Sequence, residues 1–322
     1  MSININELST AKLDFNYWQD IIKNIKHNID QIIDNKHITK ILKYDIDIEF
    51  VFDDLGSEEK FGPNACAKYI DTEKNIYQIV LGRKLLTVLR HFSFKVIDYD
   101  DIFPKISRIE INREKLSKLS DTIFYLWVDF ICLHEWFHIV RGHLNYGHEN
   151  LNENFQIDEF SKNKYFDDNE INLYLEIDAD RFAGKVLTGR FSLMRESLAV
   201  ILNLNEEDMI EGFSIFMIYL FDLFFLLSDN SRGKVHPSPS ERMLFLIAAM
   251  QEAIHANPKL FNLTEKKFLS LTETALKKHY KKHEEEYILN AKDILITMKT
   301  LDTYTKIIKD IKLNDYQILK EL

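Results

Sequence analysis

The residues with the clearest capacity for chemistry form the run His134-Glu135-Trp136-Phe137-His138, an H-E-x-x-H motif in a stretch that is typical of a helix. Positions four apart on a helix lie about 40° from each other, so the two imidazoles would project from one face and could share a metal ion. Glu135 stands next to the first histidine and could reach a metal-bound water without being a ligand itself. The motif therefore predicts a zinc site with its catalytic base built in.

A catalytic zinc site needs a third protein ligand and an open position for water. Glu176 is one candidate, and Asp180 shares its predicted helical face four positions later, where it could accept a hydrogen bond from a ligating imidazole. Two acids at this spacing repel each other mildly unless a cation or donor is near, which favours a site over a solvated helix face. His143 is the rival ligand, because a helix break at Gly142 would turn it back toward the motif.

Three motifs in this order resemble the gluzincin metallopeptidases. HEWFH followed by Glu176-x-x-Ala179-Asp180 resembles the HtpX/Ste24-like branch in particular, and the motif extended through Gly142-His143 resembles that branch and the phage-exclusion Lit-type peptidases equally. Downstream, the run from His236-Pro237 to Arg242 resembles the His-Pro…Arg element of the HtpX/Ste24-like enzymes. The resemblance covers roughly residues 120–245, and the lack of clear transmembrane helices favours the soluble, Lit-like group.

Matched position by position, the resemblance implies that the metal ligands are His134, His138 and Glu176. It implies that Glu135 is the base and that Asp180 is the partner of a ligating imidazole. It also implies that His236 or Arg242 lies near the site. His236 could stabilise the oxyanion of a tetrahedral intermediate. Arg242 could instead be structural, pairing with an acid such as Asp180 or Glu241.

The hydrophobic periodicity predicts a mainly α-helical chain with one small antiparallel sheet of about three strands, an α+β fold that the resemblance makes zincin-like. The predicted strands are 46–52, 65–70 and 76–81, the last two joined by a hairpin loop. The motif helix is expected over 122–140, with Ser120 or Asp121 as N-cap and Gly142 as its stop. Further helices are expected over 1–43, 169–187 and 213–227, and the polar stretch 145–169 is expected to be a loop or lid.

We expect a single domain over residues 1–322, with a motif-bearing core at about 120–245. The N-terminal helix and the small sheet would occupy 1–110, and C-terminal helices would occupy 257–322. With 46% apolar residues the chain can form a sizeable core, while only nine glycines and five prolines favour long helices over an all-β fold.

Charge and cysteine content narrow the class of protein further. A net charge of −10 offers no electrostatic case for nucleic acid as a partner, and two cysteines do not suggest a disulfide scaffold, so a cytoplasmic location is expected. No signal-peptide apolar region is expected in the first residues. The most membrane-like run, 213–227, is shorter than the ~20 residues of a transmembrane helix and contains Asp222, so we expect no transmembrane span, although a peripheral membrane contact stays open.

The predicted function is zinc-dependent hydrolysis of peptide bonds in a protein substrate, which an edge strand of the sheet could hold in extended form. The Lit resemblance suggests a role in phage defence, with the elongation factor Tu as candidate substrate. One alternative is a regulatory peptidase that cleaves a transcriptional repressor. Another is a metal-stabilised binding protein without turnover, which a closed four-ligand site using both His143 and Glu176 would favour.

Overall fold

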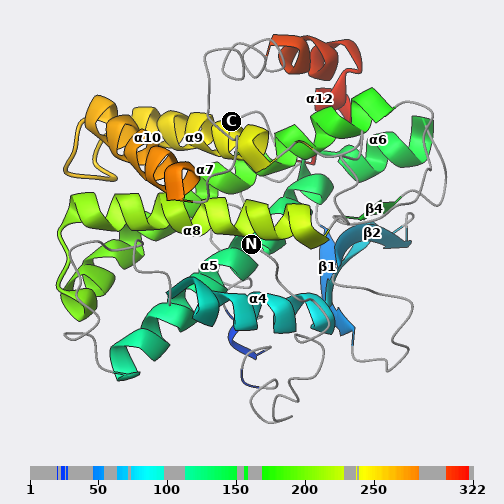
Figure 1. Ribbon diagram of the computed structural model, residues 1–322. Coiled ribbons are helices and arrows are strands. Elements are labelled where there is room, and N and C mark those ends of the chain that lie inside the picture. The colour runs from blue at the N-terminus through cyan, green and yellow to red at the C-terminus, as the bar shows by residue number, and fades with distance from the viewer. Residues whose placement is uncertain are drawn as a thin grey trace.

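The computed structural model describes residues 20, 23–25, 27, 46–53, 64–71, 74–97, 113–150, 156–158, 169–227, 237, 239–282 and 302–318. In these residues a small sheet stands at one side of a largely helical body (Figure 1). Most of the predicted helix over 1–43 lies outside the described residues, and so does His236.

The sheet has four strands in the order β1-β3-β2-β4, which are β1 (Asp47–Asp53), β2 (Ala65–Asp71), β3 (Ile76–Gly82) and β4 (Gln156–Asp158). The hairpin of β2 and β3 is antiparallel as predicted, and β4 also pairs with β2 in antiparallel fashion. The prediction of a purely antiparallel sheet is wrong at β1, which pairs with β3 in parallel. The neighbour of β1 in the sheet is β3 rather than β2. Strands β1 and β2 run in opposite directions, and the chain reverses between β2 and β3, so β3 runs in the same direction as β1.

Most of the remaining described chain is helical. The helices are α4 (Arg83–Ile97), α5 (Arg113–Val140), α6 (His143–Asn150), α7 (Asn169–Leu202), α8 (Glu206–Leu227), α9 (Pro239–Ala256), α10 (Glu265–Lys282), a helical stretch over 302–310, and α12 (Leu313–Tyr316). The mainly α-helical α+β class is therefore confirmed.

Helices α5, α7 and α8 have boundaries that differ from the predicted ones, and α8 begins at Glu206 rather than at residue 213. The motif helix α5 begins at Arg113, so Ser120 and Asp121 are not its N-cap; instead the buried Ser120 lies inside the helix, facing Ser93 and Arg90 of α4. Helix α7 continues to Leu202, and the buried side chains of Thr188, Phe191 and Leu198 extend its packed face beyond the predicted end. The polar stretch 145–169 is not all loop, since α6 occupies its first residues and β4 its middle.

Helix α5 forms the centre of the core and packs on α4, α7 and α8 as well as on β2 and β3. Its buried Trp127 donates a hydrogen bond from Nε1 to the backbone carbonyl of Phe216 in α8 at 2.8 Å. Among the described residues, the stretch Glu114–Val140 is the one long and apolar enough to cross a membrane, but 94% of its most apolar window is buried inside the protein. Burial by its own neighbours accounts for the apolar composition of α5 without any lipid.

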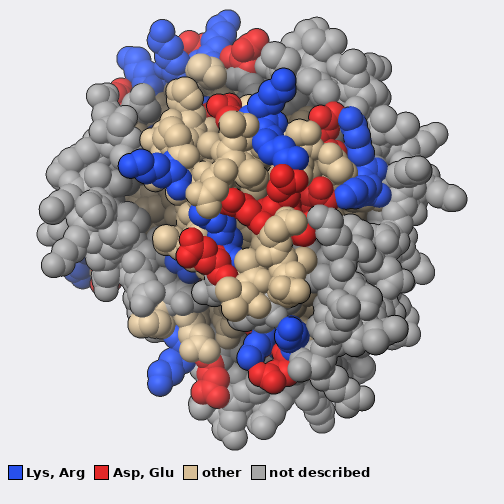
Figure 2. All heavy atoms as spheres, turned by 90° about the vertical axis from the view of Figure 1, so that its left-hand side faces the viewer, with Lys and Arg blue, Asp and Glu red and all other residues tan. Residues whose placement is uncertain are grey.

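The side of the molecule at the left of Figure 1 carries acidic and basic side chains next to one another (Figure 2). Ion pairs connect α10 with α8, from Lys267 to Glu207 at 2.9 Å and from Lys278 to Glu211 at 2.6 Å. The described part of this face therefore mixes both signs of charge, and paired surface charges of this kind contribute little stability.

Candidate metal centre

Two long helices, α5 and α7, position the candidate site. Helix α5 brings the H-E-x-x-H motif into the middle of the core, and α7 packs along it. Ala179 and Ala183 are fully buried on α7, where small side chains let two helices approach closely. The site is thus built between regular elements rather than on loops, which holds its side chains in defined positions.

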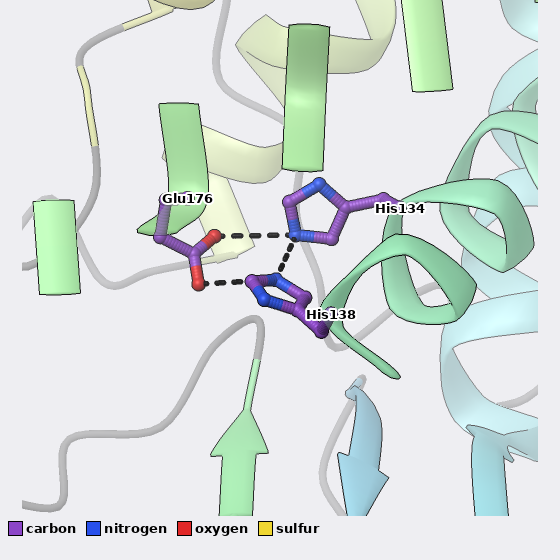
Figure 3. A group of neighbouring side chains, drawn as sticks. All are labelled: His134, His138 and Glu176. Atoms are coloured by element: carbon purple, nitrogen blue, oxygen red, sulfur yellow. Dashed lines mark hydrogen bonds and ion pairs between the residues drawn. The ribbon is translucent and has the colours of Figure 1, made fainter. Parts of the chain in front are cut away.

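Three side chains converge between these helices: His134 and His138 from α5, and Glu176 from α7 (Figure 3). The two Nε2 atoms are 2.9 Å apart, and the carboxylate oxygens of Glu176 lie 3.2 Å from His134 Nε2 and 3.5 Å from His138 Nε2. Ligand atoms on a tetrahedral metal with bonds of about 2.0 Å are about 3.3 Å from one another. The three side chains could therefore hold one metal ion with little movement.

His134 is held from behind by a carboxylate. Its Nδ1 lies 2.9 Å from Asp180 Oδ1, and Asp180 in turn accepts two hydrogen bonds from Arg242, from Nε at 2.7 Å and from Nη2 at 2.6 Å. The Arg242 guanidinium also lies over the rings of Phe221 and Phe224. When an imidazole binds a metal through Nε2, a carboxylate at this position can accept the proton on Nδ1.

His138 is held from behind by a second histidine. Its Nδ1 is 2.8 Å from Nδ1 of His143, and Nε2 of His143 is 2.9 Å from Asp178 Oδ2. Arg141 donates to Asp178 from Nε at 2.8 Å and from Nη2 at 3.3 Å, and the Tyr304 hydroxyl donates to the same carboxylate.

Burial and charge fix the protonation states of this group. Burial lowers the pKa of His138 well below its usual value and also lowers the pKa of His143, so both rings are neutral. Burial alone would raise the pKa of Asp178, but the charge of Arg141 and the hydrogen bond from His143 outweigh it and hold that pKa below its usual value. Neutral imidazoles are the form that binds metals.

The donor set gives a test of whether the group fits a metal. The Nε2 atoms of His134 and His138 lie 2.9 Å apart beside the Glu176 carboxylate, and all three side chains are buried. The donor set and its surroundings therefore fit a divalent metal ion, and two nitrogens with one carboxylate oxygen suit several such metals.

Glu135 follows the first histidine and is fully buried. Its charge contributes, after burial itself and Asp129, to raising the pKa of the buried Cys132 thiol, one turn earlier on α5. On a helix its side chain projects about 100° away from that of His134. Glu135 is therefore adjacent to the metal-binding group without belonging to it.

The structure separates the two candidates for third ligand. Glu176 faces both motif histidines, whereas the two ring nitrogens of His143 face His138 and Asp178. Gly142 has φ +79° and ends α5 as predicted, which brings His143 back toward the motif but behind His138. Asp180 and Arg242, both chosen from the sequence, lie together behind His134.

Sequence reasoning missed Asp178, Arg141 and Tyr304. Asp178 projects about 200° away from Glu176 around α7, so the periodicity that identified Glu176 and Asp180 excludes it. Tyr304 belongs to a segment more than a hundred residues later, and no local pattern links the two. The one sequence signal for Asp178 was the helix break at Gly142. That break places His143 beside α7, where its partner is Asp178.

Comparisons with known proteins add no further assignment. A scan of the chain against protein-family models finds no match, and searches of curated proteins and of solved structures find none either.

Proposed function

We propose that the chain is a zinc-dependent peptidase. The observation that carries this is the convergence of His134, His138 and Glu176, with Glu135 inside the same H-E-x-x-H motif. Two histidines and a carboxylate leave one tetrahedral position for water or substrate, as in catalytic rather than structural zinc sites. The same donor set also suits non-haem iron, and the motif with its internal glutamate is what favours zinc.

Each residue around the site has a defined task in this proposal. A bound zinc ion would supply a Lewis acid that polarises a carbonyl and lowers the pKa of a water molecule. Glu135 takes the proton from the attacking water and returns it to the leaving amine. Asp180 orients His134, and Arg242 holds Asp180 by two hydrogen bonds. Outside the described residues, His236 is the candidate for stabilising the oxyanion.

The resemblance of the motifs supports a more specific proposal, with a zincin-like fold and a protein substrate. Its Lit-type part suggests elongation factor Tu as substrate, phage defence as the role and the cytoplasm as the location. A repressor-cleaving regulatory peptidase uses the same chemistry, and the identity of the substrate decides between the two.

A metal-stabilised protein without turnover is the second candidate, and burial favours it. The ligand residues are at most 3% exposed and Glu135 is 0% exposed, so the described conformation gives bulk water little access to the site. A peptidase needs a conformation in which substrate reaches Glu135, whereas a structural metal does not. Turnover is therefore the property to test.

The test is a survey of new protein N-termini in bacterial cells that produce the intact chain or Glu135→Gln. A general base of this kind contributes about 10²–10⁴-fold to rate, so we expect discrete cuts with the intact chain and none with the variant. Both purified proteins should contain one zinc per chain by elemental analysis, because Glu135 is not a ligand. Glu273→Gln, the same change at an exposed α10 residue paired with Lys277, is the matched control.

Each outcome decides between the proposals. Cuts that persist in Glu135→Gln would remove Glu135 as the base. Zinc without cuts in the intact chain would favour the binding protein. A purified chain that binds no zinc would contradict the peptidase and the metal site together.

A further inference from the structure

A line of buried contacts extends from His138 away from the candidate metal, through His143 to Asp178. The Nδ1 atoms of the two histidines are 2.8 Å apart, and His143 Nε2 is 2.9 Å from Asp178 Oδ2. All three residues are fully buried, so water does not compete for these contacts. We call His138, His143 and Asp178 the relay.

The direction of the hydrogen bonds in the relay follows from its far end. Besides His143, Asp178 receives donors from Arg141 and Tyr304, and an ionised carboxylate can only accept. His143 Nε2 must therefore carry a hydrogen. The two Nδ1 atoms can share only one hydrogen at 2.8 Å. Metal binding at Nε2 of His138 leaves the ring hydrogen of His138 on Nδ1, so His143 Nδ1 accepts that hydrogen.

We infer that Asp178 is a positioning residue for the metal site: acting through His143, it keeps the ring proton of His138 on Nδ1 and so leaves Nε2 free to bind the metal. This inference rests on the metal site proposed above. It gives His138 an indirect equivalent of the carboxylate that contacts His134 directly. In this inference His143 is not a metal ligand; it accepts the hydrogen bond from His138 Nδ1.

The C-terminal segment over 302–318 completes the surroundings of Asp178. The Tyr304 hydroxyl donates to Asp178, and Arg141, which also holds Asp178, donates from Nη1 to Gln317 Oε1 at 2.6 Å. The backbone N–H of Ile318 donates to the carbonyl of Val140 at the end of α5, at 2.8 Å. The relay is thus held between the motif helix, α7 and the C-terminal segment.

The direct test measures the tautomer of His138 in the metal-free protein by ¹⁵N NMR with labelled histidine, using His138→Gln to assign its signals. We expect the proton on Nδ1 in the wild-type chain. In Asp178→Asn the amide can donate to His143 Nε2, which would move the proton of His143 to Nδ1 and that of His138 to Nε2, the metal-facing atom. A variant that only loosened the packing would not transfer the ring proton of His138 from Nδ1 to Nε2.

Zinc affinity, measured by competition with a chelator, gives the second readout. We expect Asp178→Asn to bind zinc about 10–100-fold more weakly, the usual effect of losing the partner of a ligating histidine. Glu252→Gln is the matched control. It removes an α9 carboxylate that pairs with Arg181 on α7, the helix that carries Asp178, and Glu252 is not part of the relay. This variant should change zinc affinity by less than about 3-fold.

A pair of variants at His143 separates relay geometry from packing. His143→Gln keeps an acceptor for His138 and a donor for Asp178, so it should retain affinity within about 5-fold of the wild type. His143→Leu fills the space without either group and should bind zinc about 10–100-fold more weakly. This pair decides the matter if Asp178→Asn does not fold by circular dichroism.

The inference is overturned if the proton of His138 is on Nε2 in the wild type, or if zinc affinity is the same in Asp178→Asn and His143→Leu as in the wild type. If the wild-type chain binds no zinc, the proposed function fails. The tautomer measurement, which uses the metal-free protein, still accepts or rejects the relay in that case.

Discussion

Asp129 provides a quantitative test of how α5 and α7 are held together one turn before the motif. Its carboxylate is buried and contacts Arg190 of α7, with 2.8 Å between Oδ2 and Nη2. Burial raises the pKa of Asp129 to about 6 from an ordinary 3.8, although the charge and hydrogen bond of Arg190 act in the opposite direction. The loss of hydration therefore outweighs the attraction of the ion pair, as it can for buried pairs.

This pKa has a consequence for stability whose sign is fixed. The folded protein holds the proton of Asp129 more tightly than the unfolded chain, so its contribution is full below pH 3.8 and is lost as pH rises through about 6. The difference between the two pKa values corresponds to about 3 kcal/mol at pH 7 or above. Asp129→Asn keeps an acceptor for Arg190 without the buried charge, so it should stabilise the protein there by about 2 kcal/mol after allowance for a weaker hydrogen bond.

The assay is urea unfolding followed by tryptophan fluorescence at several pH values between 4 and 8, with a chelator present so that metal binding does not contribute. The gain of Asp129→Asn over the wild type should be near zero at pH 4 and should grow through pH 6. Asp121→Asn is the control on the same helix, because its side chain is 44% exposed and water already solvates the charge. A gain independent of pH, or a loss of stability at pH 7, would refute the reasoning.

Two further substitutions test the surroundings of the site by unfolding. Gly142→Ala should destabilise the protein by at least about 2 kcal/mol, because φ is +79° and a Cβ would lie 2.3 Å from the carbonyl carbon of Tyr316. The control is Gly189→Ala on α7, where a Cβ would meet open space, and this change should be neutral or stabilising. Equal effects of the two changes would contradict this. Arg242→Leu should cost about 3–5 kcal/mol, because it leaves Asp180 buried without its cation, and adding Asp180→Asn to it should restore part of the loss. Strict additivity in that double variant would show that the two residues do not interact.

Patterns in the sequence predicted those features that depend on residues close together in the chain. Alternation of apolar and charged residues identified β1, and the H-E-x-x-H spacing placed His134 and His138 on one helix face. The spacing of Glu176 and Asp180 likewise anticipated that both would face the motif helix, where one now lies by the histidine Nε2 atoms and the other behind His134.

Properties set by distant segments were beyond the sequence patterns. Alternation shows that β1 is a strand but not that β3 returns beside it, so the parallel pairing could not be read from periodicity. The start of α5 was misplaced because residues 113–119 are mostly polar, and polar helical turns resemble loops in composition. The Tyr304 contact with Asp178 joins residues 126 positions apart, and no spacing rule describes such a pair.

One turn of α7 connects all parts of the candidate site. Glu176 faces the motif histidines, Asp180 contacts His134 directly, and Asp178 reaches His138 through His143, so a single helical turn supplies one ligand and orients the other two. Each orienting carboxylate is held by an arginine from outside α7, Arg242 from α9 or Arg141 after α5. Rotation or sliding of α7 against α5 would therefore move one ligand and release both histidines together. Because all three candidate ligands depend on one packed interface, a bound metal and the docking of α7 on α5 would stabilise each other. A rigid interface would also hold the three side chains in position before the metal binds.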